Sequence, residues 1–353
     1  MSILPRAAGL LALLAAFAAA PASAQPAPPG AARSIQGPLP IERQGSFFVG
    51  GRTLRSDTLS TQPAYAPSGT ITVDQIYVRY QVPAGAGGKR PLVLVHGCCL
   101  TGKTWETTPD GRMGWDEAFL RQGYPTYVID QAWRGRSAAH PTTINAVRTG
   151  QAAADTLPTV FAAGQEDAWA IFRFGQRHPE VFPGMRFPLE AQEEFWKQMV
   201  PDWNFAVPTP NPTVVGLSAL AKRLEGAVLV SHSQSGIYPF QTAAVSREGI
   251  AGIVSIEPGA CPAADGDMEP YKGLPILVLW GDFVEASTRW SPRLRACRDF
   301  ARAANAAGGK VEVAVLPEMG IRGNSHMLMH DRNSLEIADW LGGWIGRNVG
   351  ERR

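Results

Sequence analysis

The sequence predicts an α/β fold, in which a mostly parallel, doubly wound sheet with an antiparallel start lies between layers of helices. Short, solidly apolar runs alternate with amphipathic segments of helical length, which is the pattern of strands buried on both faces of a parallel sheet. The stretch 70–82 instead alternates apolar and polar residues, as a half-buried antiparallel strand does. We therefore expect antiparallel strands first and a parallel sheet after them.

The individual elements follow in order from these patterns. A Pro/Gly-rich segment at 25–45 predicts an extended lead-in, and strands are expected after it at 46–50 and 70–82. Six buried strands are expected at 91–95, 126–130, 227–230, 253–256, 276–280 and 311–316. Helices are expected at 115–122, 216–224, 237–247, 294–306 and 334–348. We assign 46–353 to one domain.

The segment 138–212 interrupts this alternation, since it is much longer than one connecting helix. Of the 31 aromatic residues in the chain, 10 fall within 161–205, so the segment has enough apolar surface to bury itself as a helical excursion. An insertion at the carboxyl end of a parallel sheet lies where open α/β sheets bind ligands. We expect a cap insertion that lines an apolar pocket; the alternative is a helical subdomain whose aromatic residues pack only on one another.

Residues 1–24 have the features of a signal peptide. Arg6 provides the positive charge, an apolar run follows at 7–20, and small residues precede Ala24. The run is shorter than the roughly 20 residues that cross a bilayer, and no later segment is apolar for long enough. We expect cleavage near Ala24 and a secreted or periplasmic product without a membrane span.

The charge composition argues against a nucleic-acid partner. The chain has 33 Lys and Arg against 31 Asp and Glu, a net charge of +2, and its basic residues form no cluster. We therefore expect a small-molecule partner. The sequence leaves the oligomeric state open.

The four cysteines allow more than one pairing. In an oxidising compartment we expect a Cys261–Cys297 disulfide, which would join the loop after a strand to a later helix. The remaining pair would then be Cys98–Cys99, whose eight-membered ring distorts the peptide between the two residues. Crossed pairing and free thiols are alternatives, and no spacing of cysteine and histidine indicates a zinc site.

A candidate nucleophile follows the strand at 227–230. The next residues, 231–236, read Ser-His-Ser-Gln-Ser-Gly and lead into a predicted helix. A nucleophile elbow needs small residues two positions on either side of its serine, and usually these are glycines. Here Ser231 and Ser235 take the glycine positions, which makes Ser233 the predicted nucleophile.

A candidate oxyanion hole follows the strand at 91–95, where His96 and Gly97 precede Cys98. This His-Gly step resembles the oxyanion loop of serine hydrolases. In such a loop the backbone N–H after the glycine acts together with the N–H after the nucleophile, here those of Cys98 and Gln234.

The general base is expected on the loop after the last strand. Among the six histidines, His326 lies there, and His330, four positions later, is the alternative. The acid that orients the base has two candidates, both at strand ends. Glu257 follows the strand at 253–256 directly, and we favour it over Asp282, which follows the next strand out of register with the usual position.

The order Ser233, Glu257, His326 resembles that of the α/β-hydrolase family, whose triads run nucleophile, acid, base along the chain. The segment 130–137 also resembles a turn of this family. More closely, the chain is similar to secreted bacterial serine esterases that have a vicinal disulfide beside the oxyanion hole. The features in common are the adjacent cysteines, the Ser-His-Ser-Gln-Ser elbow and the glutamate after the sixth strand.

This resemblance implies a serine carboxylesterase of the α/β-hydrolase type that cleaves small carboxylic esters without a cofactor or a metal. A thioesterase or an amidase would use the same triad. A catalytically inactive ligand-binding protein on a hydrolase scaffold is the alternative from another functional class.

Overall fold

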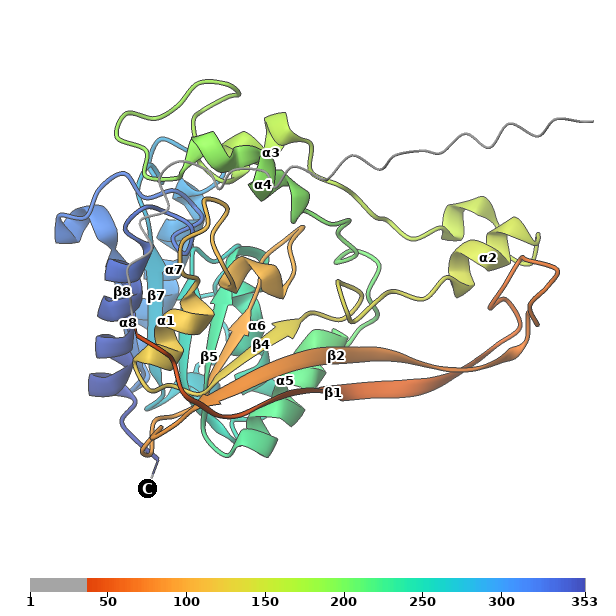
Figure 1. Ribbon diagram of the computed structural model, residues 1–353, viewed down its shortest axis with the longest axis horizontal. Helices are drawn as coiled ribbons and strands as arrows, with labels where there is room; N and C mark the ends of the chain where they lie inside the picture. Colours follow the sequence, from red (N-terminus) through yellow and green to blue (C-terminus); the bar gives the residue numbers. More distant parts are fainter. Residues whose placement is uncertain (1–36, 353) are drawn as a thin grey trace, which may run out of the picture.

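The computed structural model describes residues 37–352, which contain one eight-stranded sheet covered by helices (Figure 1). The strand order is β1-β2-β4-β3-β5-β6-β7-β8. The pairs β1–β2 and β2–β4 are antiparallel and all later pairs are parallel, so the predicted fold class is confirmed. The strands are β1 (Ile41–Ser56), β2 (Gly69–Pro83), β3 (Leu92–Val95), β4 (Thr126–Asp130), β5 (Ala227–His232), β6 (Ile250–Ile256), β7 (Pro275–Trp280) and β8 (Lys310–Val315). The expected signal peptide, 1–24, lies outside the described residues.

Two groups of helices bury the two faces of the sheet. Helices α5, α6 and α7 share a core with one face, and α1 and α8 share a core with the other. In β3, Val93 and Val95 belong to the first core and Leu92 and Leu94 to the second, which explains why the whole strand is apolar. The helices are α1 (Trp115–Arg121), α2 (Thr142–Arg148), α3 (Gln165–Ile171), α4 (Gln192–Lys197), α5 (Pro212–Leu224), α6 (Tyr238–Val245), α7 (Ser291–Ala306) and α8 (Ser334–Asn348). Within 37–352, none of the helices has the length and apolarity needed to cross a membrane.

Strands β1 and β2 form a ribbon that projects beyond the sheet toward α2 (Figure 1). β2 pairs with β1 along its whole length but with β4 only from Tyr77 to Gln81. β1 is much longer than the strand predicted at 46–50 and begins at Ile41, inside the segment 25–45 that we expected to be a lead-in.

The segment 138–212 leaves the sheet after β4 and carries α2, α3 and α4. Its aromatic rings pack on one another, with centroids 4.2 Å apart for Phe174 and Phe187 and 5.0 Å apart for Phe172 and Phe195. The same rings join the core that α1 and α8 form on the sheet. The insertion is therefore anchored in the main core.

Candidate active site

The predicted nucleophile stands on a sharp turn between β5 and the short 3₁₀-helix at Ser233–Ile237. Ser233 has φ +58°, in the left-handed region that a residue with a side chain rarely adopts, and the surrounding packing holds it there. Ser235 Oγ donates to the carbonyl oxygen of Val95 in β3. A Cβ on Gly236 would lie 2.5 Å from Pro258 Cβ, so only glycine fits at that position. The turn is therefore fixed on both sides of the serine.

The structure places His326 between Ser233 and Glu257. The Nε2 atom of His326 lies 2.8 Å from Ser233 Oγ, and its Nδ1 atom lies 3.0 Å from Glu257 Oε2. All three side chains are buried, and each residue follows a strand of the parallel part of the sheet. The three predicted site residues thus form one continuous line of hydrogen-bonding contacts.

The alternative residues of the sequence analysis have other partners. His330 Nε2 lies 3.0 Å from the carbonyl oxygen of Thr104. The Asp282 carboxylate accepts the backbone N–H groups of Phe283 and Gly323. Neither side chain is hydrogen-bonded to Ser233 or His326 within the described chain.

The loop that carries His326 is held by the buried carboxylate of Asp331. Asp331 accepts the backbone N–H and the hydroxyl of Ser325, at 2.9 and 2.7 Å, and the side-chain amide of Asn324. Burial raises the pKa of Asp331 to about 7, although these hydrogen bonds oppose the shift. Burial lowers the pKa of His326 to about 4 against the opposing effect of Glu257, so the ring is neutral at pH 7 and can accept a proton.

The Glu257 carboxylate accepts hydrogen bonds from three directions. Arg173 donates from Nη1 to Oε2 and from Nη2 to Oε1, both at 2.5 Å, and the Gly281 N–H donates to Oε1. The remaining contact is that with His326. Burial alone would raise the pKa of Glu257, but the Arg173 charge and the hydrogen bonds lower it to about 2. The carboxylate is therefore ionised in a fully buried site.

The loop after β3 passes directly against the elbow. A Cβ on Gly97 would lie 2.8 Å from Ser233 Cβ and 2.9 Å from His232 Nδ1. Cys98 and Gln234 line the same cavity as Ser233. Within residues 37–352, the backbone N–H groups of Cys98 and Gln234 donate to no other group, so both are free to bind a ligand oxygen.

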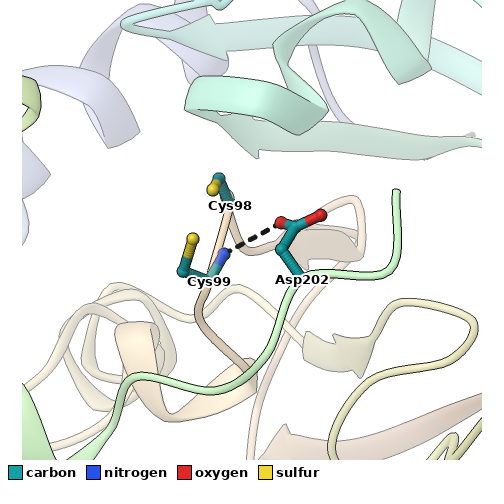
Figure 2. A group of neighbouring side chains, drawn as sticks. All are labelled: Cys98, Cys99 and Asp202. Carbon is teal, nitrogen blue, oxygen red and sulfur yellow. Dashed lines mark hydrogen bonds between the residues drawn. The ribbon is translucent and has the colours of Figure 1, made fainter. Parts of the chain in front are cut away.

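The two adjacent cysteines depart from the expectation. Cys98 and Cys99 are free thiols, not the predicted vicinal disulfide (Figure 2). The loop conformation is fixed instead by hydrogen bonds, since Cys99 donates its N–H to Asp202 Oδ2 at 3.2 Å and accepts the N–H of Val200. An eight-membered ring would distort the peptide between the cysteines. A hydrogen bond with Cys99 and burial both raise the pKa of the Cys98 thiol. The expected Cys261–Cys297 disulfide is present and joins the segment after β6 to α7.

Cys98, Cys99 and Asp202 are also the one group of potential metal ligands found in the described chain, with donor atoms within 4.8 Å of one another. The Asp202 carboxylate is already paired with Arg134 Nη2 at 2.6 Å, and both side chains are buried. A fixed positive charge at that distance opposes the binding of a cation. These residues do not fit a metal site.

The Arg134–Asp202 pair links the three segments around the nucleophile. Arg134 donates to the carbonyl oxygen of Gly97 and to the side-chain oxygen of Gln234. Asp202 lies in the insertion, and Arg134 follows β4. Sequence reasoning missed this pair and Arg173. The only available signal for Arg173 was an arginine between Phe172 and Phe174, where apolar neighbours indicate a buried cation.

A cavity of about 540 Å³ opens beside Ser233. Its large apolar residues come from the insertion and from the segment before α7. They are Phe161, Ile171, Phe205 and Trp290, and the charged residues are Asp167, Arg289 and Arg293. A cavity of this size and composition suits a small organic ligand.

Comparisons with known proteins find similarity to an esterase and to a lipase. No protein-family model matches the chain. A solved structure described as that of a novel bacterial esterase is 60% identical, with a TM-score of 0.87 over 89% of this chain and 98% of the esterase. A probable secreted lipase, phiG, of a fungus (Fungal sp.) is 27% identical in an alignment of 326 positions that covers 76% of this chain and 85% of the lipase.

Proposed function

Since this chain belongs to the α/β-hydrolase esterases and is a hydrolase of ester bonds, we propose that it is a secreted serine carboxylesterase that acts on small carboxylic esters. The observation that carries the proposal is the line of contacts from Ser233 Oγ to His326 Nε2, 2.8 Å, and from His326 Nδ1 to Glu257, 3.0 Å. A nucleophile, a base and a carboxylate at these distances can activate a serine for acyl transfer.

In the first half of the reaction, His326 Nε2 takes the hydroxyl proton of Ser233 while Oγ attacks the ester carbonyl carbon. The negative charge that develops on the carbonyl oxygen is stabilised by the N–H groups of Cys98 and Gln234. The ionised Glu257 stabilises the imidazolium ring. His326 then donates its proton to the departing alcohol oxygen, which leaves the acyl group on Ser233.

In the second half, water replaces the alcohol. His326 removes a proton from the water as its oxygen attacks the acyl carbon, and the same two N–H groups stabilise the second tetrahedral intermediate. Return of the proton to Ser233 Oγ releases the carboxylic acid. Because one histidine acts as base and then as acid in each half, the reaction needs no other titrating group.

The cavity supports a preference for small substrates. The insertion 138–212 acts as a cap, since Phe161, Ile171 and Phe205 line the same cavity as the nucleophile. We expect butyrate esters to be hydrolysed faster than palmitate esters, because a cavity of about 540 Å³ has room for a short acyl group together with its leaving group, whereas a palmitoyl chain would have to fold up to fit beside the same leaving group.

Export is part of the proposal. The features of 1–24 predict cleavage near Ala24 and release into the periplasm or the medium. A Cys261–Cys297 disulfide is consistent with an oxidising compartment. Mass spectrometry of the protein recovered from the producing cells measures the cleavage site.

The test of the mechanism is labelling with a fluorophosphonate, which reacts with an activated serine. The proposal predicts a single adduct on Ser233, found by peptide mass spectrometry, and none in Ser233→Ala. The matched control is Ser246→Ala, at the end of α6, which should label and hydrolyse p-nitrophenyl butyrate like the wild type. An adduct on another residue, or ester hydrolysis by Ser233→Ala, would overturn the assignment.

A substrate panel then separates esters from other acyl compounds. The protein should cleave p-nitrophenyl butyrate faster than the corresponding butyranilide and faster than a butyryl thioester. A reversed order with unchanged labelling of Ser233 would identify the same site as that of an amidase or a thioesterase.

A further inference from the structure

Two residues of the insertion 138–212 contact the groups assigned to catalysis, which gives the insertion a second role beyond lining the cavity. We propose that the insertion positions the catalytic groups, with Arg173 fixing the Glu257 carboxylate and Asp202 fixing the two loops that carry the oxyanion N–H groups. This inference rests on the proposed function.

Arg173 is placed by a strained turn just after α3. It has φ +56°, and its side chain is 1% exposed. Its Nη1 and Nη2 atoms donate to the two oxygens of Glu257, and its Nε donates to the carbonyl oxygen of Asp282 at 2.9 Å. Such a two-point contact between guanidinium and carboxylate fixes both the position and the rotation of the carboxylate.

The orientation of Glu257 decides which nitrogen of His326 carries the proton. A fixed, ionised carboxylate accepts Nδ1–H, so that Nε2 presents its lone pair to Ser233. A buried carboxylate without a cation favours its neutral form and would bind the ring less firmly. Arg173 acts through Glu257 and is therefore a positioning residue.

The charge of Arg173 also acts on His326 directly, since Nη1 lies 3.3 Å from Nδ1. The other titratable groups around this pair are His232, whose ring centroid lies 4.7 Å from that of His326, Arg293 in α7, and Asp331 below the loop. Arg173 and Arg293 both lower the pKa of His326. Removal of Arg173 alone should therefore raise the pKa at which the Glu257–His326 pair takes up a proton.

Asp202 fixes the two loops that carry the oxyanion N–H groups, and Figure 2 shows its contact with Cys99 in the first of them. Its Oδ2 atom accepts the N–H of Cys99 at 3.2 Å and the side-chain N–H of Gln234 at 3.3 Å. The side chain is completely buried, and its charge is balanced by Arg134. One carboxylate thus holds the loop after β3 and the elbow at a fixed separation.

Arg173→Met and Arg173→Lys test the first half of the proposal. We expect kcat on p-nitrophenyl butyrate to fall about 100-fold or more in Arg173→Met with little change in KM, and to recover partly in Arg173→Lys. The acid limb of kcat/KM should move to higher pH by about half a unit or more, because a positive charge beside His326 is removed. Arg177→Met is the matched control, since Arg177 lies in the same insertion but is 80% exposed.

The pH profile distinguishes positioning from a structural role. A folded Arg173→Met or Arg173→Lys enzyme with the wild-type kcat and the wild-type acid limb would overturn this half of the proposal. In Arg173→Met, a low kcat with an unmoved limb would also overturn it, since it would show a structural role. Arg173→Lys keeps the positive charge, so its acid limb should stay in place. If Arg173→Met does not fold, the kcat of Arg173→Lys decides, and a wild-type kcat would overturn this half, because lysine cannot make the two-point contact with the carboxylate. Activity in Ser233→Ala would instead indicate failure of the proposed function.

Asp202→Asn tests the second half, with Asp155→Asn, an exposed position of the insertion, as the control. We expect kcat to fall about 10-fold or more, since a misplaced oxyanion donor weakens transition-state binding, while the acid limb of kcat/KM stays in place. The tetrahedral analogue butaneboronic acid should bind Asp202→Asn more weakly by a similar factor. Unchanged kcat and unchanged boronate affinity in the folded variant would refute the role of Asp202.

A second inference rests on the charge of the cavity. Arg289 and Arg293 line it, and Asp167 is the only acidic residue of its lining within the described chain. Asp167 lies 3.8 Å from Arg289, whereas Arg293 forms no ion pair with any residue of 37–352. Arg293 Nε donates to the carbonyl oxygen of Gly259, and Nη1 donates to that of Arg289. The Gly259 N–H donates to the carbonyl oxygen of Ser233, so the guanidinium is held close to the nucleophile. Its Nη2 group has no hydrogen-bond partner within 37–352.

We infer that the cavity selects esters whose acid or alcohol part carries a second, ionised carboxylate, and that Arg293 binds this group. Arginine suits the task because its planar fork can donate two parallel hydrogen bonds to a carboxylate. This inference deepens the proposed function, since it names the substrate class of the same site.

The test compares substrates of equal chain length within one enzyme. Mono-p-nitrophenyl glutarate carries a carboxylate where p-nitrophenyl valerate carries a methyl group. Arg293→Gln should lower the ratio of their kcat/KM values about 10-fold relative to the wild type. The ratio of 4-butyryloxybenzoate to phenyl butyrate tests the alcohol part in the same way. Arg295→Gln, on the same helix, is the control.

A fall in the first ratio places the carboxylate in the acid part, and a fall in the second places it in the alcohol part. If neither ratio changes in Arg293→Gln, the inference is wrong. Hydrolysis of the neutral valerate by the wild type measures the proposed function separately, so the two failures can be told apart.

Discussion

The substitution Glu257→Gln tests the buried charge pair beside His326. It removes the negative charge but keeps the size of the side chain. Glu257 is fully buried and Arg173 is 1% exposed, so the guanidinium would be left without its counter-ion and without water. Removing one partner of a buried ion pair costs about 3–5 kcal/mol, and we expect the free energy of unfolding to fall by that amount.

The same substitution should nearly abolish turnover. Donors from Arg173, Gly281 and His326 converge on the two carboxylate oxygens, but glutamine has one oxygen and one NH₂ group. At least one donor must then face another donor. Loss of the acceptor for Nδ1–H lets the ring adopt the wrong tautomer, and in trypsin-like proteases this change lowers kcat about 10⁴-fold.

Urea unfolding and kcat on p-nitrophenyl butyrate measure the two effects separately. The double variant Glu257→Gln/Arg173→Met removes both charges, and we expect it to be more stable than Glu257→Gln alone but equally inactive. The control is Glu190→Gln, which breaks the exposed pair with Arg332 and should change stability by less than about 1 kcal/mol. A loss of stability no larger than that of the control, or near-normal kcat in Glu257→Gln, would refute the reasoning.

Three further predictions concern pH, the disulfide and the loop after β3. Burial lowers the pKa of His326 to about 4, and only the neutral ring accepts a proton. We therefore expect kcat/KM to stay constant from pH 8 to about 5 and to fall only below that. An acid limb near 6.5, the ordinary pKa of histidine, would contradict this prediction. Cys261→Ser/Cys297→Ser should lower the free energy of unfolding by about 3–4 kcal/mol, since the bond closes a loop of 36 residues, and leave kcat at 25 °C unchanged. Gly97→Ala should lower kcat about 100-fold in the folded enzyme. The added Cβ would lie 2.8 Å from Ser233 Cβ, and the resulting shift of the loop would displace the oxyanion N–H of Cys98. A wild-type kcat in this variant would contradict the prediction.

Much of the site could be predicted because its residues follow strands. Ser233, Glu257 and the loop of His326 come after runs whose apolar composition indicates parallel strands. Parallel strands end at the same edge of a sheet, so the side chains after them lie near one another even before the strand order is known. The three residues therefore come to one place, but the distances between their atoms depend on loop conformations that the strand pattern does not fix.

Arg173 and Asp202 could not be predicted in this way. Both lie in the insertion 138–212, where no strand period fixes the position of a residue relative to the sheet. Their partners, Glu257 and Arg134, are distant in sequence, so the pairs exist only through tertiary packing. The predicted Cys98–Cys99 disulfide was wrong for a related reason. Counting cysteines gives the possible pairings, but it does not give the conformation of the peptide between two neighbouring cysteines.

The extent of β1 was underestimated because its sequence lacks a sustained apolar face. Only Phe47, Phe48 and Val49 form an apolar run within Ile41–Ser56, and beyond Gly50 most of the strand is exposed. Its partner β2 supplies the backbone hydrogen bonds along the whole ribbon. A strand stabilised mainly by pairing leaves little trace in a hydrophobic pattern.

The two buried pairs make the insertion and the sheet parts of one active site. Arg173 and Asp202 both belong to the insertion. Their partners belong to the rest of the domain, since Glu257 follows β6 and Arg134 follows β4. A chain without 138–212 would therefore leave one unpaired negative charge at Glu257 and one unpaired positive charge at Arg134, both beside Ser233. A replacement segment that buried these two groups again without supplying partners would leave each as an unpaired buried charge, which costs about 3–5 kcal/mol. An insertion transplanted from a related esterase can be compatible with this sheet only if it brings an arginine and a carboxylate to these two points.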